Sequence, residues 1–399
     1  MEKNDSIAEL LTRGVDEVII KNDLEKKLRS GKKLRIKFGI DPTGSLLHLG
    51  HSVSLLKLKE FQDLGHTVIL LIGDHTAEIG DPSGRSKERA PLNSDQIKKH
   101  MASYREQVGR LLNLKKIEVR YNSEWYTHLS ILEFSNLTSK ITVPQILQRA
   151  DFKKRLKEGE DVSVREAFYP LLQGYDSVML KTDVEVGGTD QRFNLLMGRQ
   201  IQKRYGQEEQ NVMMISLLEG TDGVAKMSKT EDNFIALTEE ANSMYGKIMS
   251  IPDALIIRYF NLITRVPMKE IRELEKQMDD HSLNPRDAKM RLAREIVTLY
   301  HHKTKSQQAE DAFINTFQKK VVPEHITTFT PSRSHVPLVD LLVETKLASS
   351  KTEARKLIEQ RSVSINDVTI NDIHHETIIP KDGVVLKKGK RHFVKIIAE

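Results

Sequence analysis

Two histidines stand three positions apart in the segment "DPTGSLLHLGHS", which covers residues 41–52. His48 and His51 flank Gly50, and a glycine lets a ligand approach the backbone closely. Imidazole rings can bind a metal ion, exchange a proton or donate hydrogen bonds to an anion. The chain has no cysteine, so a closed metal site here would lack thiolate ligands. The spacing alone leaves open a structural role, contact with phosphate, or a metal site.

A second candidate group lies in "VAKMSKT", residues 224–230. Lys226 and Lys229 stand on either side of a serine, and Thr230 follows them. A lysine ammonium is a flexible point charge, which suits a reaction in which charge moves on a phosphate. The alternative interpretation is a solvated surface loop.

A third group follows a capping pattern that starts a helix at Ser163. Tyr169, Gln173 and Asp176 are spaced i, i+4 and i+7, so they share one face of that helix. Polar groups aligned in this way either face water or line a pocket.

Two further segments place polar residues directly after predicted strands. In "GDHTAEIGDPSGRSKER", Asp81 stands in a turn with Arg85 and Arg89 behind it, and an ordinary exposed turn is the alternative. In "GGTDQ", Asp190 and Gln191 stand at another strand-to-helix junction.

The elements that must position these groups follow from hydrophobic patterning. Residues 34–40 predict a strand, residues 50–65 a helix and residues 66–74 a buried strand. A strand, a crossover helix and a second strand form the unit of a parallel, Rossmann-like sheet. Such sheets bind ligands beyond the carboxyl ends of their strands, where the segment 41–52 would lie. Unpaired N–H groups at the start of the helix would then suit a phosphate.

Bulk composition indicates a soluble globular protein of two or three domains. The chain has 399 residues, of which 38% are hydrophobic and 30% charged. Its apolar runs are too short to span a bilayer, the N-terminus lacks a signal-peptide pattern, and the absence of cysteine fits a reducing cytoplasm. The net charge of +6 is compatible with a polyanionic partner.

The second half of the chain has a different pattern. Charge-rich amphipathic segments from 239 to 320 predict helices, and a Pro/Ser/Thr-rich stretch follows them. A small unit with a helix and short strands ends the chain. Basic residues gather in it, and they suit contact with phosphate or simply a solvated surface: Lys351, Arg355, Lys356, Lys387, Lys388, Lys390 and Arg391.

In combination, these motifs resemble a known family. "HLGH" followed by "KMSKT" resembles the paired signatures of class I aminoacyl-tRNA synthetases. "GIDPT", "IGDPSG", "YPLLQGYD" and "GGTDQ" are similar to the tyrosyl/tryptophanyl subgroup, in details that look like bacterial-type tyrosyl-tRNA synthetase. Residues 350–366 resemble a small RNA-binding module, named for a ribosomal protein, that is appended to tyrosyl enzymes of this type.

The resemblance implies an α/β fold with three functional parts. These are a Rossmann-like catalytic domain with a connective insertion, a helical anticodon-binding domain, and a small α+β RNA-binding domain after a linker. The expected ranges are 1–235, 236–322, 323–335 for the linker, and 336–399. The implied reaction activates L-tyrosine with ATP to tyrosyl-adenylate and transfers the tyrosyl group to tRNA(Tyr). A tryptophan-specific sibling and a non-catalytic RNA-binding relative are the alternatives.

The resemblance also implies roles for individual residues. The catalytic set around the ATP phosphates would be Thr43, His48, His51, Arg85, Arg89, Lys226, Lys229 and Thr230. The ATP and adenylate contacts would be Asp41, Gly50, Ser54, Gly188, Asp190 and Gln191. The tyrosine contacts would be Lys37, Asp81, Tyr169, Gln173, Asp176 and Gln191.

One position departs from the family pattern. Many members have a tyrosine two residues before the glycine of "GIDPT", and it bonds the substrate hydroxyl; here that position is Lys37. Asp176 is then expected to recognise the hydroxyl largely alone. The resemblance further implies Mg²⁺ carried by ATP without a dedicated protein ligand, a homodimer, and a cytoplasmic protein with no membrane partner.

Overall fold

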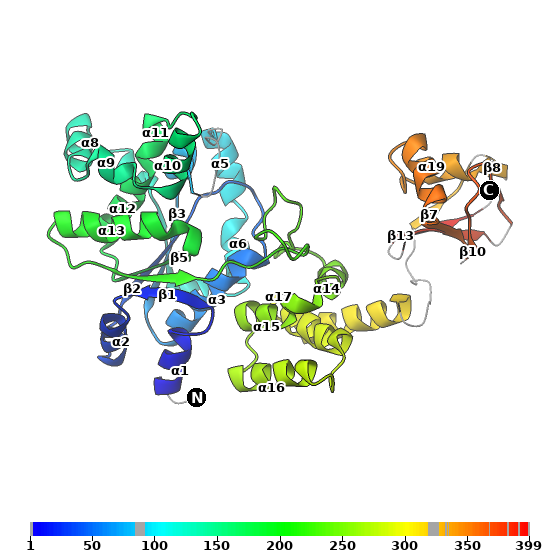
Figure 1. Ribbon diagram of the computed structural model, residues 1–399, viewed down its shortest axis with the longest axis horizontal. Helices are drawn as coiled ribbons and strands as arrows, with labels where there is room; N and C mark the ends of the chain where they lie inside the picture. Colours follow the sequence, from blue (N-terminus) through cyan, green and yellow to red (C-terminus); the bar gives the residue numbers. More distant parts are fainter. Residues whose placement is uncertain are drawn as a thin grey trace. The chain divides into compact units, whose positions relative to one another are not determined.

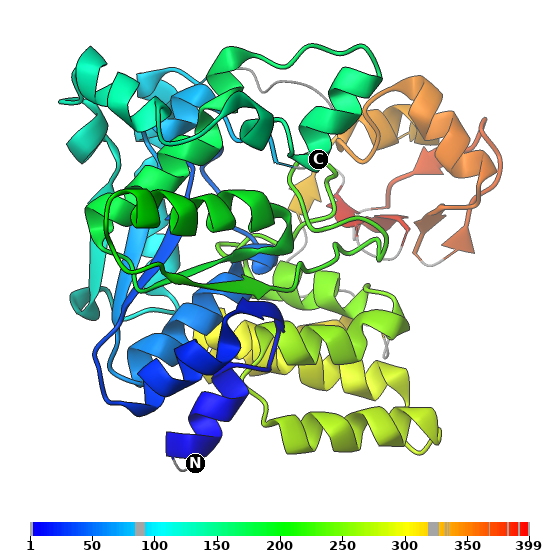
Figure 2. The ribbon, with the colours of Figure 1, turned by 60° about the vertical axis from the view of Figure 1, so that its left-hand side comes forward.

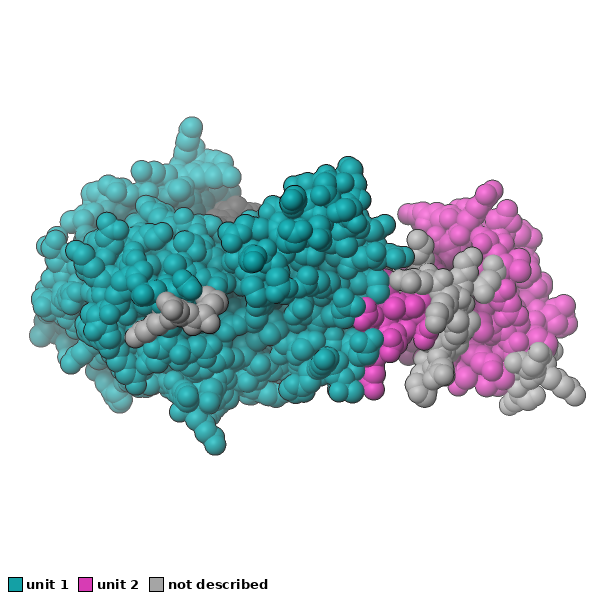
Figure 3. All heavy atoms as spheres, turned by 90° about the horizontal axis from the view of Figure 1, so that it is seen from below, with its two compact units in different colours: residues 1–307 teal, residues 308–399 magenta. Residues whose placement is uncertain are grey.

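A computed structural model describes residues 3–83, 92–317, 327–331, 333, 335–366, 368–380, 383–389 and 392–397. Residue contacts divide the chain into two compact units, 1–307 and 308–399, coloured teal and magenta in Figure 3. Four residues with a predicted role lie outside the described residues: Arg85, Arg89, Lys390 and Arg391.

A six-stranded sheet forms the centre of the first unit (Figure 1). Its order is β1-β6-β5-β2-β3-β4, and all neighbours are parallel except β1, which is antiparallel to β6. Most residues of β3, β5 and β6 are buried, as in sheets covered on both faces. The strands are β1 Val15–Ile19, β2 Arg35–Ile40, β3 Thr67–Ile72, β4 Ile117–Tyr121, β5 Val184–Gly188 and β6 Asn211–Ile215.

The helices that follow these strands bring the site residues to the sheet. The predicted strand–helix–strand unit is confirmed as β2, α3 and β3, with α3 running from Leu49 to Asp63. The helix predicted from Ser163 is two helices, α11 and α12, separated by a turn at Phe168 two positions before Pro170. The further helices of this part are α1 Lys3–Leu10, α2 Lys21–Arg29, α4 Thr76–Ile79, α5 Ser94–Met101, α6 Tyr104–Gly109, η1 Leu114–Lys116, α7 Ser123–Tyr126, α8 Ile131–Thr138, α9 Val143–Ile146, α10 Ala150–Lys157, α11 Val164–Ala167, α12 Tyr169–Leu180, η2 Thr189–Gln191 and α13 Arg192–Arg204.

A group of helices follows the sheet, as the charge-rich segments predicted. Figures 1 and 2 show these yellow-green to yellow helices side by side. Their mutual packing buries apolar side chains such as Ile256, Phe260 and Ile296. The helices are α14 Ala241–Met249, η3 Asp253–Leu255, α15 Ile256–Ile263, α16 Met268–Asp279 and α17 Pro285–Phe317, which is kinked at His302.

The second unit has its own hydrophobic core, built from Leu338, Leu342, Ile358 and Leu386 among others. Strand β7 lies inside the predicted linker 323–335 and pairs in parallel with β13, so part of that segment belongs to the sheet. The elements are β7 Thr327–Phe329, β8 His335–Pro337, α18 Leu338–Glu344, α19 Lys351–Glu359, β9 Val363–Ile365, β10 Val368–Thr369, β11 Glu376–Ile378, β12 Val384–Lys388 and β13 His392–Ile396. Across the described parts of both units, no helix combines the length and apolar character needed to cross a membrane.

Candidate active site

A cleft of about 1030 Å³ opens beyond the carboxyl ends of the parallel strands. This is the edge of the sheet at which a parallel α/β fold binds its ligands. Every predicted catalytic, nucleotide and tyrosine residue that the structure describes lines it. These are Lys37, Asp41, Thr43, His48, Gly50, His51, Ser54, Asp81, Tyr169, Gln173, Asp176, Gly188, Asp190, Gln191, Lys226, Lys229 and Thr230.

The two histidines stand at the N-terminus of α3, with ring centroids 4.0 Å apart. The backbone N–H of His48 donates to Nδ1 of His51 at 3.2 Å, so the proton of a neutral His51 ring lies on Nε2. Burial, with the charge of Lys229, lowers the pKa of His51 to about 4. Burial, His51 and Lys229 lower the pKa of His48 to about 2. Both rings are therefore neutral hydrogen-bonding groups near pH 7.

The Nδ1 atom of His48 faces Gly50 in the first turn of α3. Nδ1 of His48 is buried and lacks a hydrogen-bond partner among the described residues. A Cβ at Gly50 would lie 2.9 Å from that atom, so only glycine leaves the space for this ring position.

The "KMSKT" loop reaches across the cleft from the other side. Lys226 forms an ion pair with Asp190 at 2.8 Å. The ammonium of Lys229 donates to the backbone oxygen of Leu46 at 3.1 Å, and a Cβ at Gly44 would collide with it. The loop therefore places two cations against the residues predicted to meet ATP.

Two carboxylates hold the middle of the cleft. Asp41 accepts hydrogen bonds from the hydroxyls of Tyr169 at 2.9 Å and Thr76 at 2.8 Å. Asp81 accepts from the side-chain amide of Gln191 at 2.7 Å and from the backbone of Ser83 at 2.9 Å. Fixed carboxylates of this kind suit a substrate ammonium or a ribose hydroxyl.

Asp176 lies at the buried end of the cleft, on α12. Its Oδ1 accepts from the indole of Trp125 at 3.0 Å and the hydroxyl of Tyr126 at 2.9 Å. Asn122 donates to Oδ2 at 3.4 Å. Burial raises the pKa of Asp176 to about 6, while the charge of Lys37 and these donors lower it. Asp176 is thus a buried acceptor that is ionised above about pH 6.

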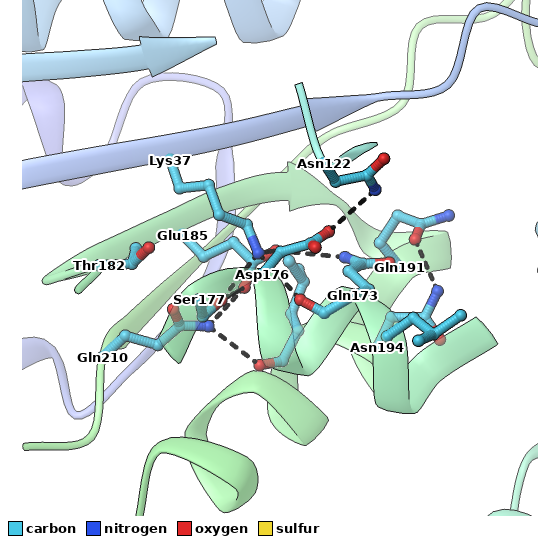
Figure 4. Close-up of polar contacts among 12 residues, drawn as sticks. Lys37, Asn122, Gln173, Asp176, Ser177, Thr182, Glu185, Gln191, Asn194 and Gln210 are labelled. Carbon is cyan, nitrogen blue, oxygen red and sulfur yellow. Dashed lines mark hydrogen bonds and ion pairs between the residues drawn. The ribbon is translucent and has the colours of Figure 1, made fainter. Parts of the chain in front are cut away.

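Lys37 is fully buried and joins a polar network beneath Asp176 (Figure 4). Its ammonium lies 2.9 Å from Oε1 of Glu185, whose side chain is equally buried. It also donates to Oγ of Ser177 at 2.7 Å and to the backbone oxygen of Gln173 at 3.1 Å. The residue that departs from the family pattern is therefore part of the cleft.

Sequence reasoning missed several residues of this site. Asn122, Trp125 and Tyr126 hold Asp176, and Glu185 pairs with Lys37. One available signal was that "YNSEWY" begins at Tyr121, the last residue of β4, at the carboxyl edge of the sheet. The acid within the apolar strand "VEVGG" was the signal for Glu185.

The basic residues of the second unit occupy different settings. Lys351, Arg355 and Lys356 on α19 are exposed, and Lys351 pairs with Asp340 at 2.7 Å. Lys388 donates to the backbone oxygen of Leu347 at 2.6 Å and also contacts Glu353, so it is tied to its own domain. The ammonium of Lys387 lies over the ring of Phe393.

No group of three or more histidine, aspartate or glutamate side chains is placed to hold a metal ion within the described ranges. The cleft instead offers neutral imidazoles, ammonium groups and backbone N–H groups, which are donors suited to phosphate oxygens. It combines this donor-rich end with a buried end that carries an acceptor.

Comparison with known proteins relates this geometry to a family. Residues 29–318 match the family model of class I tRNA synthetases (W and Y). Residues 318–396 match the model of the tyrosine–tRNA ligase SYY-like C-terminal domain. The tyrosine–tRNA ligase of Carboxydothermus hydrogenoformans is 47% identical over 98% of this chain and 97% of its own length. The enzyme of that name from Thermotoga maritima is 46% identical over 97% and 96%.

Solved structures share the fold of the chain. A C-terminally truncated mitochondrial tyrosyl-tRNA synthetase of Coccidioides posadasii aligns with a TM-score of 0.64 and 27% identity, over 77% of this chain and 91% of its own. A tyrosyl-tRNA synthetase of Archaeoglobus fulgidus, complexed with L-tyrosine, aligns with a TM-score of 0.61 and 21% identity, over 77% and 100%. The predicted α/β fold and the predicted resemblance are confirmed. The chain belongs to the tyrosine–tRNA ligases, within the tryptophan and tyrosine group of class I tRNA synthetases.

Proposed function

We propose that this chain ligates tyrosine to its tRNA and that the cleft described above carries the chemistry. In the first step, a carboxylate oxygen of tyrosine bonds to the α-phosphorus of ATP and pyrophosphate leaves. In the second step, a ribose hydroxyl of the terminal adenosine of tRNA attacks the tyrosyl carbonyl and AMP leaves. Full-length relatives named tyrosine–tRNA ligase favour this specificity over tryptophan and over a non-catalytic role.

The single observation that carries the assignment of the site is the buried acceptor at one end of the cleft. Asp176 is positioned by Trp125 and Tyr126 to accept the phenolic hydrogen of tyrosine. Phenylalanine would leave this buried carboxylate without one of its hydrogen-bond donors, which costs free energy. Asp81, Tyr169 and Gln173 line the same cleft and would bind the substrate ammonium.

The donor-rich end of the cleft would align ATP and stabilise the charge that develops on its phosphates. Neither step needs a protein nucleophile, so catalysis rests on alignment and electrostatics. His48, His51 and Thr43 would donate to the phosphate chain, and Lys226, Lys229 and Thr230 would close over the pyrophosphate. The further contacts of ATP and adenylate would be Asp41, Gly50, Ser54, Gly188, Asp190 and Gln191. Arg85 and Arg89, outside the described residues, would add positive charge.

Magnesium would enter with ATP as part of the substrate. Mg²⁺ keeps several waters and is held mainly by phosphate oxygens in such sites. The ion would supply charge neutralisation on the phosphates, while the residues named above orient the nucleotide.

The tRNA would contact parts of the chain beyond the cleft. Helices within the proposed range 236–322 would meet the anticodon arm, and the module of 336–399 would add a second contact after a connecting segment at 323–335. Exposed Arg355 and Lys356 on α19 are the described cations best placed for phosphate, with Lys351 beside them. Lys387, Lys390 and Arg391 would add to this surface, while Lys388 would serve chiefly to hold the domain together.

We also propose a homodimer in the cytoplasm, built through the first unit. Four large apolar side chains are strongly exposed there on α8, α9 and α11: Ile131, Leu132, Val143 and Val164. An exposed cluster of this kind is typical of a protein–protein interface. A second copy of the chain is the occupant that the family resemblance implies.

Charging of tRNA tests the function directly. The full chain, incubated with ATP, radiolabelled tyrosine and tRNA(Tyr), is expected to place label in acid-precipitable RNA, whereas labelled tryptophan with its tRNA gives none. Tyrosine-dependent exchange of pyrophosphate into ATP without any charging would refute the second step.

A further inference from the structure

Lys37 and Glu185 face each other directly across two neighbouring strands. They are register partners in the parallel pairing of β2 with β5, so their side chains leave the same face of the sheet. Both side chains are almost completely buried, and both line the cleft near Asp176. A buried ion pair costs desolvation free energy, which is offset only when its geometry is good and its other hydrogen bonds are satisfied.

The hydrogen bonds of this pair are satisfied within the protein. A lysine ammonium has three hydrogens, and Lys37 has three acceptors: Glu185, Ser177 and the backbone oxygen of Gln173. Glu185 also accepts from Gln210, from Gln173 at 3.2 Å and from Ser177 at 3.2 Å. The ammonium therefore has no hydrogen left to donate to a substrate hydroxyl.

We propose that Lys37, held in place by Glu185, is a specificity-determining positioning residue that keeps the Asp176 carboxylate negatively charged as the acceptor of the phenolic hydrogen. Lys37 acts on Asp176 through its charge and does not contact the substrate. This inference rests on the proposed function of the cleft.

The surroundings of Asp176 fit this role. The charged and titratable groups around it include Lys37 on β2, Glu185 on β5, Tyr126 on α7 and Tyr169 on α12. Asp41 is bound to Tyr169, and the ring of His75 stacks on Tyr126 at 5.1 Å. Among them Lys37 is the cation, and it opposes the rise in the pKa of Asp176 that burial causes. Figure 4 shows the Lys37 ammonium next to Asp176, Ser177 and Glu185.

Two variants are expected to shift the pH dependence of activity in opposite directions. Glu185→Gln leaves the positive charge of Lys37 unbalanced, and this lowers the pKa of Asp176. The fall of kcat/KM for tyrosine in acid, called the acid limb here, then moves to lower pH. Lys37→Met combined with Glu185→Gln removes the cation without stranding a buried anion. The acid limb is then expected to rise by about one pH unit, and the preference for tyrosine over phenylalanine at pH 6.5 is expected to fall.

The experiment measures tyrosine- and phenylalanine-dependent exchange of pyrophosphate into ATP by the full chain from pH 5 to 8.5. A matched control is the double variant Lys57→Met and Glu60→Gln, which neutralises a buried lysine and its partly exposed partner on α3, outside the cleft. The acid limb of this control should lie at the same pH as that of the unaltered chain. Thermal melting establishes which variants are folded.

The outcomes separate the possibilities. Opposite shifts of the acid limb support the inference. Shifts in the same direction, or lowered activity with an unmoved acid limb, would overturn it, as would failure of both variants to fold, because the pair would then be only structural. Absence of tyrosine-dependent exchange in the unaltered chain would overturn the proposed function and the inference with it.

Discussion

The ammonium of Lys226 lies 2.8 Å from the carboxylate of Asp190, across the mouth of the cleft. One partner comes from the "KMSKT" loop and the other from the junction of β5 and α13, so the contact joins the two sides of the nucleotide end. Bound ATP offers phosphate oxygens that compete for this cation. We infer that Lys226 exchanges its carboxylate partner for phosphate during the reaction.

Lys226→Ala is expected to slow adenylate formation about 100-fold while leaving the KM for tyrosine nearly unchanged, because a cation facing developing phosphate charge acts mainly in the transition state. Pyrophosphate exchange kinetics measure both constants. Lys203→Ala, at an exposed position of α13, is the control and should behave like the unaltered chain. Normal kcat with a raised KM for tyrosine would refute the role given to Lys226.

Asp176→Asn keeps the shape of the side chain and removes its charge. The free energy of a buried hydrogen bond lost or left unsatisfied is about 1–3 kcal/mol, so kcat/KM for tyrosine should fall roughly 10- to 100-fold. Because phenylalanine has no hydroxyl, kcat/KM for phenylalanine should fall much less. Measuring kcat/KM with both amino acids tests this prediction. Asp287→Asn, at an exposed position of α17, is the control. An unchanged ratio of the two kcat/KM values would show that Asp176 does not recognise the hydroxyl.

The buried His48 is expected to make the fold less stable in acid. Its pKa is about 2 in the folded chain and 6.5 as an ordinary histidine, so below pH 6.5 the unfolded state binds a proton that the folded state excludes. The free energy of unfolding should therefore fall, by about 1.4 kcal/mol per pH unit from this residue. Denaturant titrations from pH 6.5 to 4 should give a shallower decline for His48→Asn. His128→Asn, at an exposed position, serves as the control. If the free energy of unfolding fell equally steeply with pH in His48→Asn and in the unaltered chain, that would count against a buried neutral ring.

The exposed cations of α19 are expected to bind tRNA through its phosphates. Arg355→Ala combined with Lys356→Ala should weaken tRNA binding and reduce the slope of log affinity against log salt by about one to two. Tyrosine activation should not change, because neither residue lines the cleft. Filter binding at several salt concentrations measures the slope. The control combines Lys115→Ala with Lys116→Ala in the exposed η1 and should have the same salt slope as the unaltered chain. An unaltered slope in the α19 variant would place the RNA contact elsewhere.

Local sequence was sufficient for the features that depend on neighbouring residues. The spacing of His48 and His51, the helix start beside them and the run of apolar residues in β3 are all readable within short segments. The family resemblance then related distant motifs, such as Lys226 and Asp176, and the cleft indeed contains both. Parallel-sheet topology explains why Asp41, Asp81 and Asp190 meet, since each lies in the segment after β2, β3 or β5 at the same edge of the sheet, whereas Asp176 comes from helix α12.

Contacts between distant segments were beyond local patterns. Trp125 and Tyr126 reach Asp176 from about fifty positions earlier, and Lys37 meets Glu185 only because β2 and β5 pair. The break at Phe168, by contrast, had a local signal, because Pro170 stands in the first turn of α12 and has no backbone N–H to continue the helix before it. Strand β7 in the predicted linker is stabilised by its pairing with β13 and by Phe329, which packs against the core of its unit.

The most direct test of the central claim is amino-acid-dependent exchange of labelled pyrophosphate into ATP by the purified full chain at pH 7.5. Tyrosine, phenylalanine and tryptophan are compared at equal concentrations. Rapid exchange with tyrosine and only trace exchange with the other two is the expected result. Exchange that is as fast with tryptophan or phenylalanine, or absent with all three, would contradict a tyrosine site built around Asp176.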